Sequence, residues 1–193
     1  MKRFAIQIAG KIQKFDPEHI LDLGCGSAKG WEMIQQHMAA WRGDYTGADI
    51  TLANIEAAKA RGLARSNFVI MAENDLPFSP RQFDLIMALE VLEHLEKPAA
   101  MLTSLSALAP KYIMLSVPNE PWFSLGTLLS GRYLKRFGRD PEHLQYWNVR
   151  SFAAFAEQYL EDIRINTCFP FTIICGKPRQ ACPAVKTENH LFP

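Results

Sequence analysis

The chain has 193 residues, of which 48% are hydrophobic and 21% are charged, and its formal net charge is +1. This length suits one compact domain with a sizeable core, and the small net charge excludes a global field that would recruit nucleic acid or an acidic surface. The sequence has neither a signal-peptide pattern nor an apolar run of membrane-spanning length, so we expect a cytoplasmic protein.

Strands and helices alternate along most of the chain. Apolar positions at helical spacing predict a leading helix at 4–15 and further helices at 29–41, 51–61 and 97–108, with Thr51 as the cap of the third. Apolar and β-branched runs predict strands at 19–23, 44–49, 67–72, 83–89 and 111–117. This alternation indicates an α/β fold with a doubly wound, mostly parallel sheet and helices on both faces.

The alternation breaks after residue 117. Residues 118–148 form a long segment rich in aromatic residues and glycine, and a helix is predicted at 149–159. Two β-rich runs, at 162–168 and 172–177, suggest a hairpin and therefore an antiparallel addition at the sheet edge. We expect a single domain over 1–177, with 118–148 as an insertion, and a loosely ordered tail over 178–193.

The cysteines indicate no metal centre. Cys25, Cys168, Cys175 and Cys182 lack the spacing of zinc ligands, and the first of them lies in a turn that requires a small residue. We expect reduced thiols and no metal site.

The most informative segment is 20–30, with the sequence ILDLGCGSAKG. An apolar run ends in a carboxylate, Asp22, and passes at once into a turn with glycines at 24, 26 and 30. Glycine permits positive φ and lets a ligand approach bare backbone, and the first N–H groups of a helix favour a carboxylate or a phosphate. Lys29 stands where a dinucleotide-binding turn needs glycine, and the Walker A pattern is missing. A glycine turn without a ligand is the alternative.

The ends of the other predicted strands also carry polar residues. In a doubly wound sheet, ligands collect outside the carboxyl ends of the strands. The second strand ends in Asp49, where a carboxylate is expected to accept both hydroxyls of a ribose; the alternative is a neighbour of a helix N-cap. The third strand runs into MAEND at 71–75, and the fourth runs into EVLEHL at 90–95.

Taken together, these segments resemble the class I S-adenosylmethionine-dependent methyltransferases. The resemblance rests on ILDLGCGSAKG, YTGADI, AENDLPFSPRQFDLIMALEVLEHLEKP and YIMLSVPNEP, in the expected order and at the expected spacing over roughly residues 18–120. It implies a Rossmann-like seven-stranded sheet with an antiparallel edge strand. It also implies S-adenosyl-L-methionine as cofactor and S-adenosyl-L-homocysteine as product.

The resemblance assigns a role to each strand end. The turn of Gly24, Cys25 and Gly26 would hold the methionine end of the cofactor, with Asp22 near its ammonium group. Asp49 would accept the ribose hydroxyls, and Ile50 would pack on the adenine. Ala72 stands where an Asp is common, so contact with the adenine amino group would pass to Glu73, to the backbone of Asn74, or to Asp75. The sulfonium region would be bordered by Ala88 and Leu89.

The acceptor side is expected in the insertion, which would act as a lid. This insertion is weakly similar to the corresponding region of the ubiquinone-pathway O-methyltransferases. By that likeness His143 is the candidate base or acceptor-positioning residue, and a brace for the lid is the alternative. The other expected acceptor contacts are Asn119, Trp122, Tyr146, Trp147 and His94, the last of which has a packing role as its alternative.

An apolar stretch at 122–129 precedes four cations within the insertion. These are Arg132, Lys135, Arg136 and Arg139. Such a stretch can touch a membrane surface or seat a lipid-like substrate, and an amphipathic lid helix with one solvated face is the alternative. Without a basic stripe elsewhere, a nucleic-acid partner is not expected.

We therefore expect an enzyme that moves a methyl group to a small-molecule acceptor, at a hydroxyl or carboxyl oxygen. The alternatives are transfer to nitrogen or carbon, transfer to a protein or RNA, and an accessory protein that binds the cofactor without transferring its methyl group. NAD-dependent oxidoreduction is disfavoured by Lys29.

Overall fold

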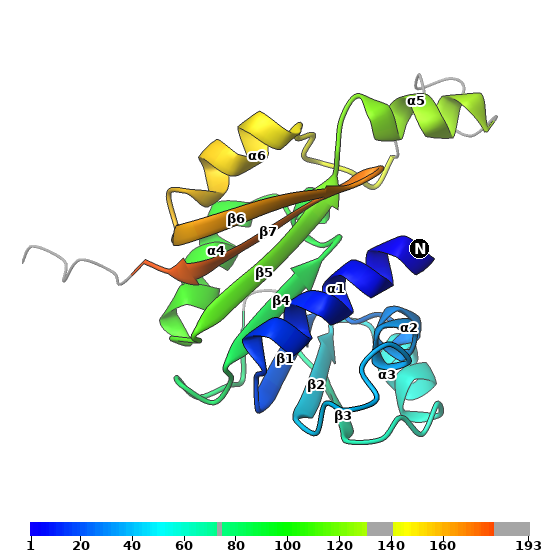
Figure 1. Ribbon diagram of the computed structural model, residues 1–193, viewed down its shortest axis with the longest axis vertical. Helices are drawn as coiled ribbons and strands as arrows, with labels where there is room; N and C mark the ends of the chain where they lie inside the picture. Colours follow the sequence, from blue (N-terminus) through cyan, green and yellow to red (C-terminus); the bar gives the residue numbers. More distant parts are fainter. Residues whose placement is uncertain (73–74, 131–140, 180–193) are drawn as a thin grey trace, which may run out of the picture.

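A computed structural model describes residues 1–72, 75–130 and 141–179 of the protein. Its centre is one seven-stranded sheet in the order β3-β2-β1-β4-β5-β7-β6 (Figure 1). The strands are β1 (His19–Leu23), β2 (Asp44–Asp49), β3 (Ser66–Ile70), β4 (Leu85–Leu89), β5 (Tyr112–Pro118), β6 (Leu160–Cys168) and β7 (Phe171–Pro178). The predicted α/β fold class is confirmed.

The first five strands pair in parallel, whereas β7 pairs antiparallel with both β5 and β6. The predicted hairpin therefore lies at the sheet edge, and its second strand is the one that joins the parallel strands. Strand β7 extends through Pro178, one residue past the boundary predicted for the tail.

Helices cover both faces of this sheet. They are α1 (Lys2–Phe15), α2 (Lys29–Gln35), α3 (Leu52–Lys59), α4 (Pro98–Ala107), α5 (Trp122–Leu129) and α6 (Val149–Ala156), with a 3-10 turn η1 at Leu92–His94. One core contains residues of α1, α2 and α3, including Ile8, Trp31 and Ile55, and the other contains Leu102 of α4 and Phe152 of α6. Alternate residues of β4, β5 and β7 enter the two cores, as the pleat requires.

The main differences between the predicted and the observed helices concern α2, α3 and α6. Helix α2 ends at Gln35 rather than at 41, because His37 and Met38 donate to carbonyls three residues back and turn the chain. Met38 is nevertheless buried, which explains its helical spacing in the sequence. Thr51 stands at the N-cap of α3, but its side chain makes no capping hydrogen bond. Helix α6 ends at Ala156 rather than at 159.

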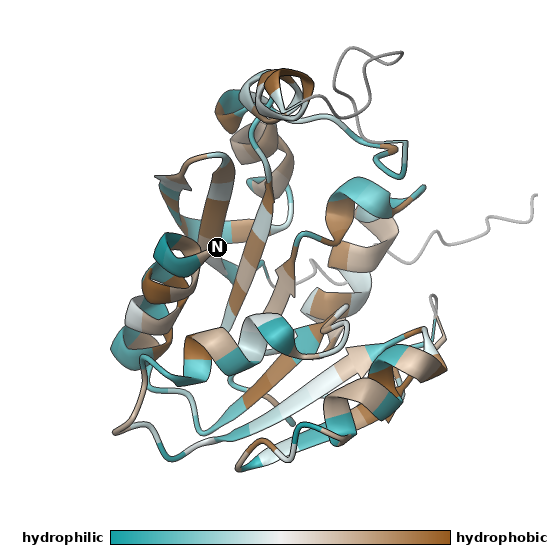
Figure 2. Cartoon of the chain, turned by 90° about the vertical axis from the view of Figure 1, so that its right-hand side faces the viewer, coloured by the Kyte–Doolittle hydropathy of each residue, from teal (hydrophilic) through white to brown (hydrophobic). Residues whose placement is uncertain are grey.

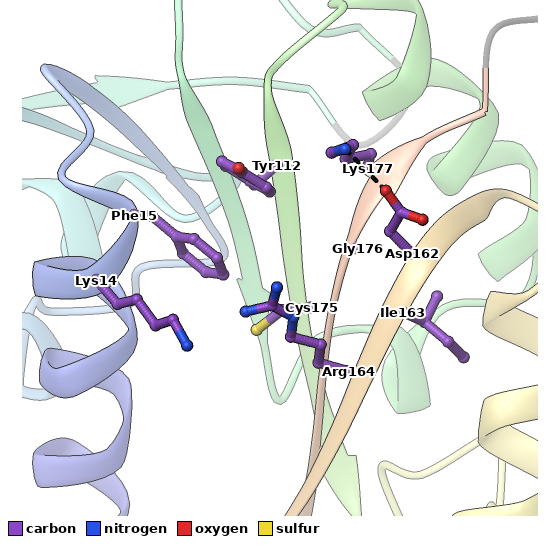
Figure 3. A pocket seen from close by; sticks show the side chains of 9 residues that line it. All are labelled: Lys14, Phe15, Tyr112, Asp162, Ile163, Arg164, Cys175, Gly176 and Lys177. Carbon is purple, nitrogen blue, oxygen red and sulfur yellow. Dashed lines mark hydrogen bonds and ion pairs between the residues drawn. The ribbon is translucent and has the colours of Figure 1, made fainter.

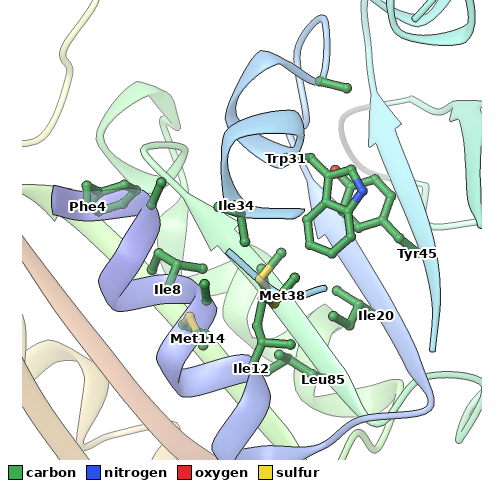
Figure 4. Packing of buried hydrophobic residues seen from close by; sticks show 14 of the residues in the cluster. Phe4, Ile8, Ile12, Ile20, Trp31, Ile34, Met38, Tyr45, Leu85 and Met114 are labelled. Atoms are coloured by element: carbon green, nitrogen blue, oxygen red, sulfur yellow. The ribbon is translucent and has the colours of Figure 1, made fainter. Parts of the chain in front are cut away.

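The core beside β1 and β2 is built around aromatic rings. Trp31 stacks on Tyr45 with ring centroids 3.9 Å apart, and both side chains are 1% exposed (Figure 4). Figure 2 shows that hydrophobic residues concentrate on the central strands and on the helix faces turned toward them. Among the described residues, no helix combines the length and the apolar character that crossing a membrane requires.

Candidate functional site

The glycine turn follows β1 and is fastened to β2. The backbone N–H groups of Gly24 and Cys25 both donate to the carbonyl oxygen of Ala48, at 2.8 and 3.1 Å. Gly24 and Gly26 have φ values of +68° and +55°, in the left-handed region that favours glycine. A Cβ on Gly24 would lie 2.6 Å from a methyl group of Val91. The turn therefore requires glycine both for its conformation and for its close approach to the chain after β4.

Asp49, at the end of β2, connects this turn to α3. Its carboxylate accepts hydrogen bonds from the N–H of Gly26 at 2.9 Å, from the N–H of Thr51 at 2.8 Å and from the amide of Asn54 at 3.1 Å. The first of these bonds uses Oδ2 and the other two use Oδ1. A carboxylate offers about four acceptor positions, so Oδ2 keeps capacity for a ligand hydroxyl. Asn54 was not identified as a site residue from the sequence. Its position in the first turn of α3, shortly after Asp49, could have indicated this contact.

Asp22 lies one strand away with its carboxylate buried. The hydroxyl of Tyr45 donates to Asp22 Oδ2 at 2.6 Å. Burial raises the pKa of Asp22 to about 7, against the lowering effect of the Tyr45 hydrogen bond, and the charge of Asp49 raises it further. An added cation would favour the ionised form of Asp22. Tyr45 was not identified as a site residue from the sequence. Tyr45 and Asp49 are four residues apart in β2 and so lie on the same face of the strand, which could have indicated this role.

Cys25 packs inside the turn rather than facing a partner cysteine. Burial raises the pKa of its thiol well above the usual range, and the charges of Asp22 and Asp49 add to this effect. A Cβ on Gly47 would lie 2.8 Å from the Cys25 sulfur, so the glycine in β2 makes room for this side chain. Cys25, Cys168 and Cys175 are free thiols, and Cys182 lies outside the described residues.

The residues expected at the adenine end lie after β2 and β3. Ile50 is 57% exposed, so its side chain is available for a flat apolar ligand. Ala72 and Asp75 form an isolated antiparallel bridge that closes a short loop. Glu73 and Asn74, the predicted adenine contacts, lie outside the described residues.

The end of β4 passes from an apolar strand into a group of acids. Ala88 is fully buried and Leu89 is half-buried. Glu90 follows with φ +58°, an uncommon value for a residue other than glycine, and its Oε1 accepts the hydroxyl of Ser116 at 2.7 Å. Burial raises the pKa of Glu90 well above its usual range even against the opposing hydrogen bond from Ser116.

The turn η1 and the insertion bring Glu93, His94 and His143 together. One possible metal-ligand atom from each residue lies within 4.8 Å of the other two. Glu93 is 1% exposed and His143 is 9% exposed. Burial raises the pKa of Glu93 well above its usual range, and the charge of Glu90 adds to this effect. The motif EVLEHL supplied two of these residues, but nothing in the sequence placed His143 beside them.

The other acceptor-side residues divide into two groups. Asn119 and Trp147 form a bridge at the base of the insertion, and the Trp147 ring packs 5.5 Å from the rings of Phe152 and Phe155. Trp122 and Tyr146 are 52% and 41% exposed. The four predicted cations at 132, 135, 136 and 139 lie outside the described residues.

A cavity of about 600 Å³ lies elsewhere, between the end of α1 and strands β5 to β7 (Figure 3). It is lined by Lys14, Phe15, Tyr112, Asp162, Ile163, Arg164, Cys175, Gly176 and Lys177. Tyr112 is the first residue of β5, so this cavity is at the amino end of that strand. The predicted site residues lie at the carboxyl ends, and none of them lines this cavity.

Known methyltransferase sequences match this chain. A family profile described as "Methyltransferase domain" matches residues 2–159. The ubiquinone biosynthesis O-methyltransferase of Bordetella parapertussis is 26% identical over 126 residues, which are 62% of this chain and 51% of that protein. The enzyme of the same name from Rhodopseudomonas palustris is 28% identical over 152 residues, 76% of this chain and 57% of that protein. The chain thus spans slightly more than half the length of these relatives.

Solved structures share the fold at low identity. The methyltransferase domain of bacterial CtHen1 aligns with a TM-score of 0.72 and 18% identity, covering 92% of this chain and 97% of that domain. The plantazolicin methyltransferase BpumL, solved with a desmethyl analogue and S-adenosylhomocysteine, aligns with a TM-score of 0.69 and 16% identity, covering 92% and 85% of the two chains.

Proposed function

The chain belongs to the class I S-adenosylmethionine-dependent methyltransferase family, and from this membership we propose that it transfers a methyl group to an oxygen of a small molecule. The observation that carries the proposal is the hydrogen bond from the Gly26 N–H to Asp49 Oδ2, at 2.9 Å. It joins the glycine turn after β1 to the acid that ends β2, at the edge of the sheet where ligands collect.

We assign the cofactor to these two strand ends. Asp22 faces the ammonium group of the methionine moiety, since a cation there offsets the burial of its carboxylate. Asp49 Oδ2 accepts a ribose hydroxyl, and Ile50 lies against the adenine. Gly24, Cys25 and Gly26 form the floor of the site, while Ala88 and Leu89 border the sulfonium. Glu73 and Asn74 are proposed as the adenine contacts.

Methyl transfer requires mainly alignment. The acceptor oxygen forms a bond to the methyl carbon as the carbon–sulfur bond breaks, and the electron pair of that bond goes to sulfur. The sulfonium thereby becomes a neutral thioether, and a hydroxyl acceptor loses its proton to a base or to water. Good alignment of nucleophile and methyl group contributes about 7–11 kcal/mol in such reactions.

We propose that residues 118–148 form the lid that seats the acceptor, within one domain that spans 1–177. Asn119 and Trp147 close its base. The ring centroid of His143 lies 5.4 Å from that of Phe123, and this imidazole is proposed to position the acceptor oxygen. Trp122, Leu125 and Leu129 of α5 are 52%, 43% and 79% exposed, and they suit an acceptor with an apolar or lipid-like part. The ubiquinone biosynthesis relatives support an oxygen acceptor.

The acceptor class is tested with S-adenosylmethionine carrying a tritiated methyl group. We expect label from incubation with cell extract to appear in the small-molecule fraction after separation by size, in an organic-extractable form. Label confined to protein or RNA would contradict the small-molecule assignment. The variant His143→Ala should lose transfer while its calorimetric affinity for S-adenosylhomocysteine stays at the parental value, and the exposed His37→Ala is the matched control.

A further inference from the structure

Glu93 carries a buried carboxyl group for which the described residues supply no hydrogen-bond partner. Glu93 is 1% exposed, and neither Oε1 nor Oε2 accepts a hydrogen bond from another residue in the described part of the chain. A buried carboxyl group without a partner is unfavourable in either protonation state, so buried acids in proteins are ordinarily hydrogen-bonded, paired with a cation or bound to a metal. The neighbouring Glu90 adds a second acid rather than a compensating cation.

Two imidazoles adjoin this carboxylate. The ligand atoms of Glu93, His94 and His143 lie within 4.8 Å of one another. We propose that these three residues bind a divalent transition-metal cation, which holds the oxygen of the methyl acceptor; the second half of this statement rests on the function proposed above. The site combines two neutral nitrogen donors with one oxygen donor, a set suited to Zn²⁺, Mn²⁺, Fe²⁺ or Co²⁺.

The ring of His94 is already oriented for coordination. Its Nδ1 lies 3.0 Å from the carbonyl oxygen of Glu142. A carbonyl only accepts hydrogen bonds, so Nδ1 carries the proton, and in the neutral ring Nε2 carries the lone pair. Metal-binding histidines commonly donate their second N–H to a carbonyl or a carboxylate in this way, which fixes the tautomer and the ring orientation.

The segment that carries His143 is fastened to η1 on both sides of that residue. The carbonyl oxygen of Glu93 accepts the backbone N–H groups of Leu144 and Gln145 at 2.7 and 3.0 Å. The amide of Gln145 also donates to the carbonyl oxygen of Leu95 at 3.2 Å. With the contact between His94 and Glu142, these hydrogen bonds join the segment of His143 to η1. The ligand atoms lie at most 4.8 Å apart, and ligands of a tetrahedral zinc ion lie roughly 3.4 Å apart, so side-chain rotations of about an ångström or less complete the site.

The proposed metal site adjoins the cofactor site. Val91, between Glu90 and the ligands, is the residue against which a Cβ on Gly24 would collide, at 2.6 Å. Three protein ligands leave coordination positions open, as in catalytic metal sites. An acceptor oxygen bound there would lie close to the glycine turn, and the cation would lower the pKa of an acceptor hydroxyl. His143 then positions the acceptor as a metal ligand, not as a base.

The test uses metal-free protein, prepared with a chelator and then dialysed, and titrates it with Co²⁺ while the visible absorption of the bound ion is recorded. We expect one Co²⁺ per chain. The variant Glu93→Gln should bind Co²⁺ at least about tenfold more weakly, and His94→Ala and His143→Ala should show similar losses. The exposed Glu96→Gln and His37→Ala are matched controls and should retain the parental affinity. Circular dichroism checks that each variant is folded.

Glu93→Gln decides the outcome, because it removes the charge with little change of shape. Parental Co²⁺ affinity in Glu93→Gln, or a parent that binds no Co²⁺ at millimolar concentration, overturns the proposal. Calorimetry of the metal-free protein with S-adenosylhomocysteine separates this result from the proposed function. If the metal-free protein binds the product but transfers no methyl group until Co²⁺ or Zn²⁺ is restored, both proposals are supported. Absence of heat overturns the cofactor assignment, while the Co²⁺ titration still decides the metal site.

Discussion

Asp22→Asn is expected to stabilise the ligand-free protein and to weaken its binding of the cofactor. Burial raises the pKa of Asp22 from 3.8 to about 7, and each pH unit by which a pKa moves corresponds to about 1.4 kcal/mol. The ionised carboxylate therefore costs on the order of 4 kcal/mol of folding free energy at pH 8. An asparagine removes this cost and still accepts the hydroxyl of Tyr45 through its amide oxygen.

The stability difference between Asp22→Asn and the parent should depend on pH. Between pH 3.8 and about 7 the folded protein holds a proton on Asp22 that the unfolded chain has lost, so the parent loses stability as the pH rises through this window. The stability gap between the variant and the parent should therefore widen from about pH 4 to about pH 7 and then stay level. In a domain of this size, the full gap corresponds to a rise in Tm of roughly 10 °C.

Urea unfolding at pH values from 4 to 8 measures this gap, and calorimetry with S-adenosylmethionine measures the functional loss. The variant should bind the cofactor roughly tenfold to a hundredfold more weakly, because it lacks a charged partner for the ammonium group. Asp44→Asn, at the other end of β2, is the control: it removes only an exposed ion pair with Arg65, so it should change the stability by at most about 1 kcal/mol and leave cofactor binding unchanged. Equal stabilities of Asp22→Asn and the parent at pH 8 would show that burial of this carboxylate carries no such cost.

The remaining predictions concern the turn and the base of the sheet. Gly24→Ala should lose about 2 kcal/mol or more of unfolding free energy, because its φ is +68° and its Cβ would meet Val91. Gly30→Ala, which has nothing within 4 Å of the added Cβ, should gain up to about 1 kcal/mol in the same denaturation assay, and equal losses would contradict this account. Burial opposes ionisation of Asp84, but Lys111 and two backbone N–H groups outweigh it and lower its pKa below 3.8. Asp84→Ala should therefore lose about 1–3 kcal/mol at pH 7, with the difference shrinking below about pH 4, and a constant difference over this range would argue against the assignment.

The strands and the positions of their final acids could be predicted because local pattern determines them. Strands β1 and β2 have the predicted bounds, and the carboxyl ends of parallel strands meet at one edge, so ligand contacts could be expected from residues at both strand ends. The end of α2 could not be predicted in this way. Met38 follows Ile34 at helical spacing and is buried with it, yet the chain between them has already left the helix.

Contacts between residues far apart in the chain could not be predicted from the local sequence pattern. The hydrogen bond between Tyr45 and Asp22 depends on how two strands align across the sheet. The approach of His143 to Glu93 depends on the path of the insertion, which is fixed by backbone hydrogen bonds to η1. Hydrogen bonds between backbone groups cannot be predicted from residue types. The sequence therefore contained Glu93, His94 and His143 as separate residues and gave no indication of a metal site.

Calorimetric titration with S-adenosylhomocysteine shows whether the two strand ends bind the cofactor. The parent should bind the product saturably, with one site per chain. In a folded Asp49→Ala variant this binding should fall at least about tenfold, because the ribose acceptor and the hydrogen bond to Gly26 are both removed, whereas Asp44→Ala should bind like the parent. A parent that binds no product, or an Asp49→Ala variant with unchanged affinity, would contradict the cofactor assignment.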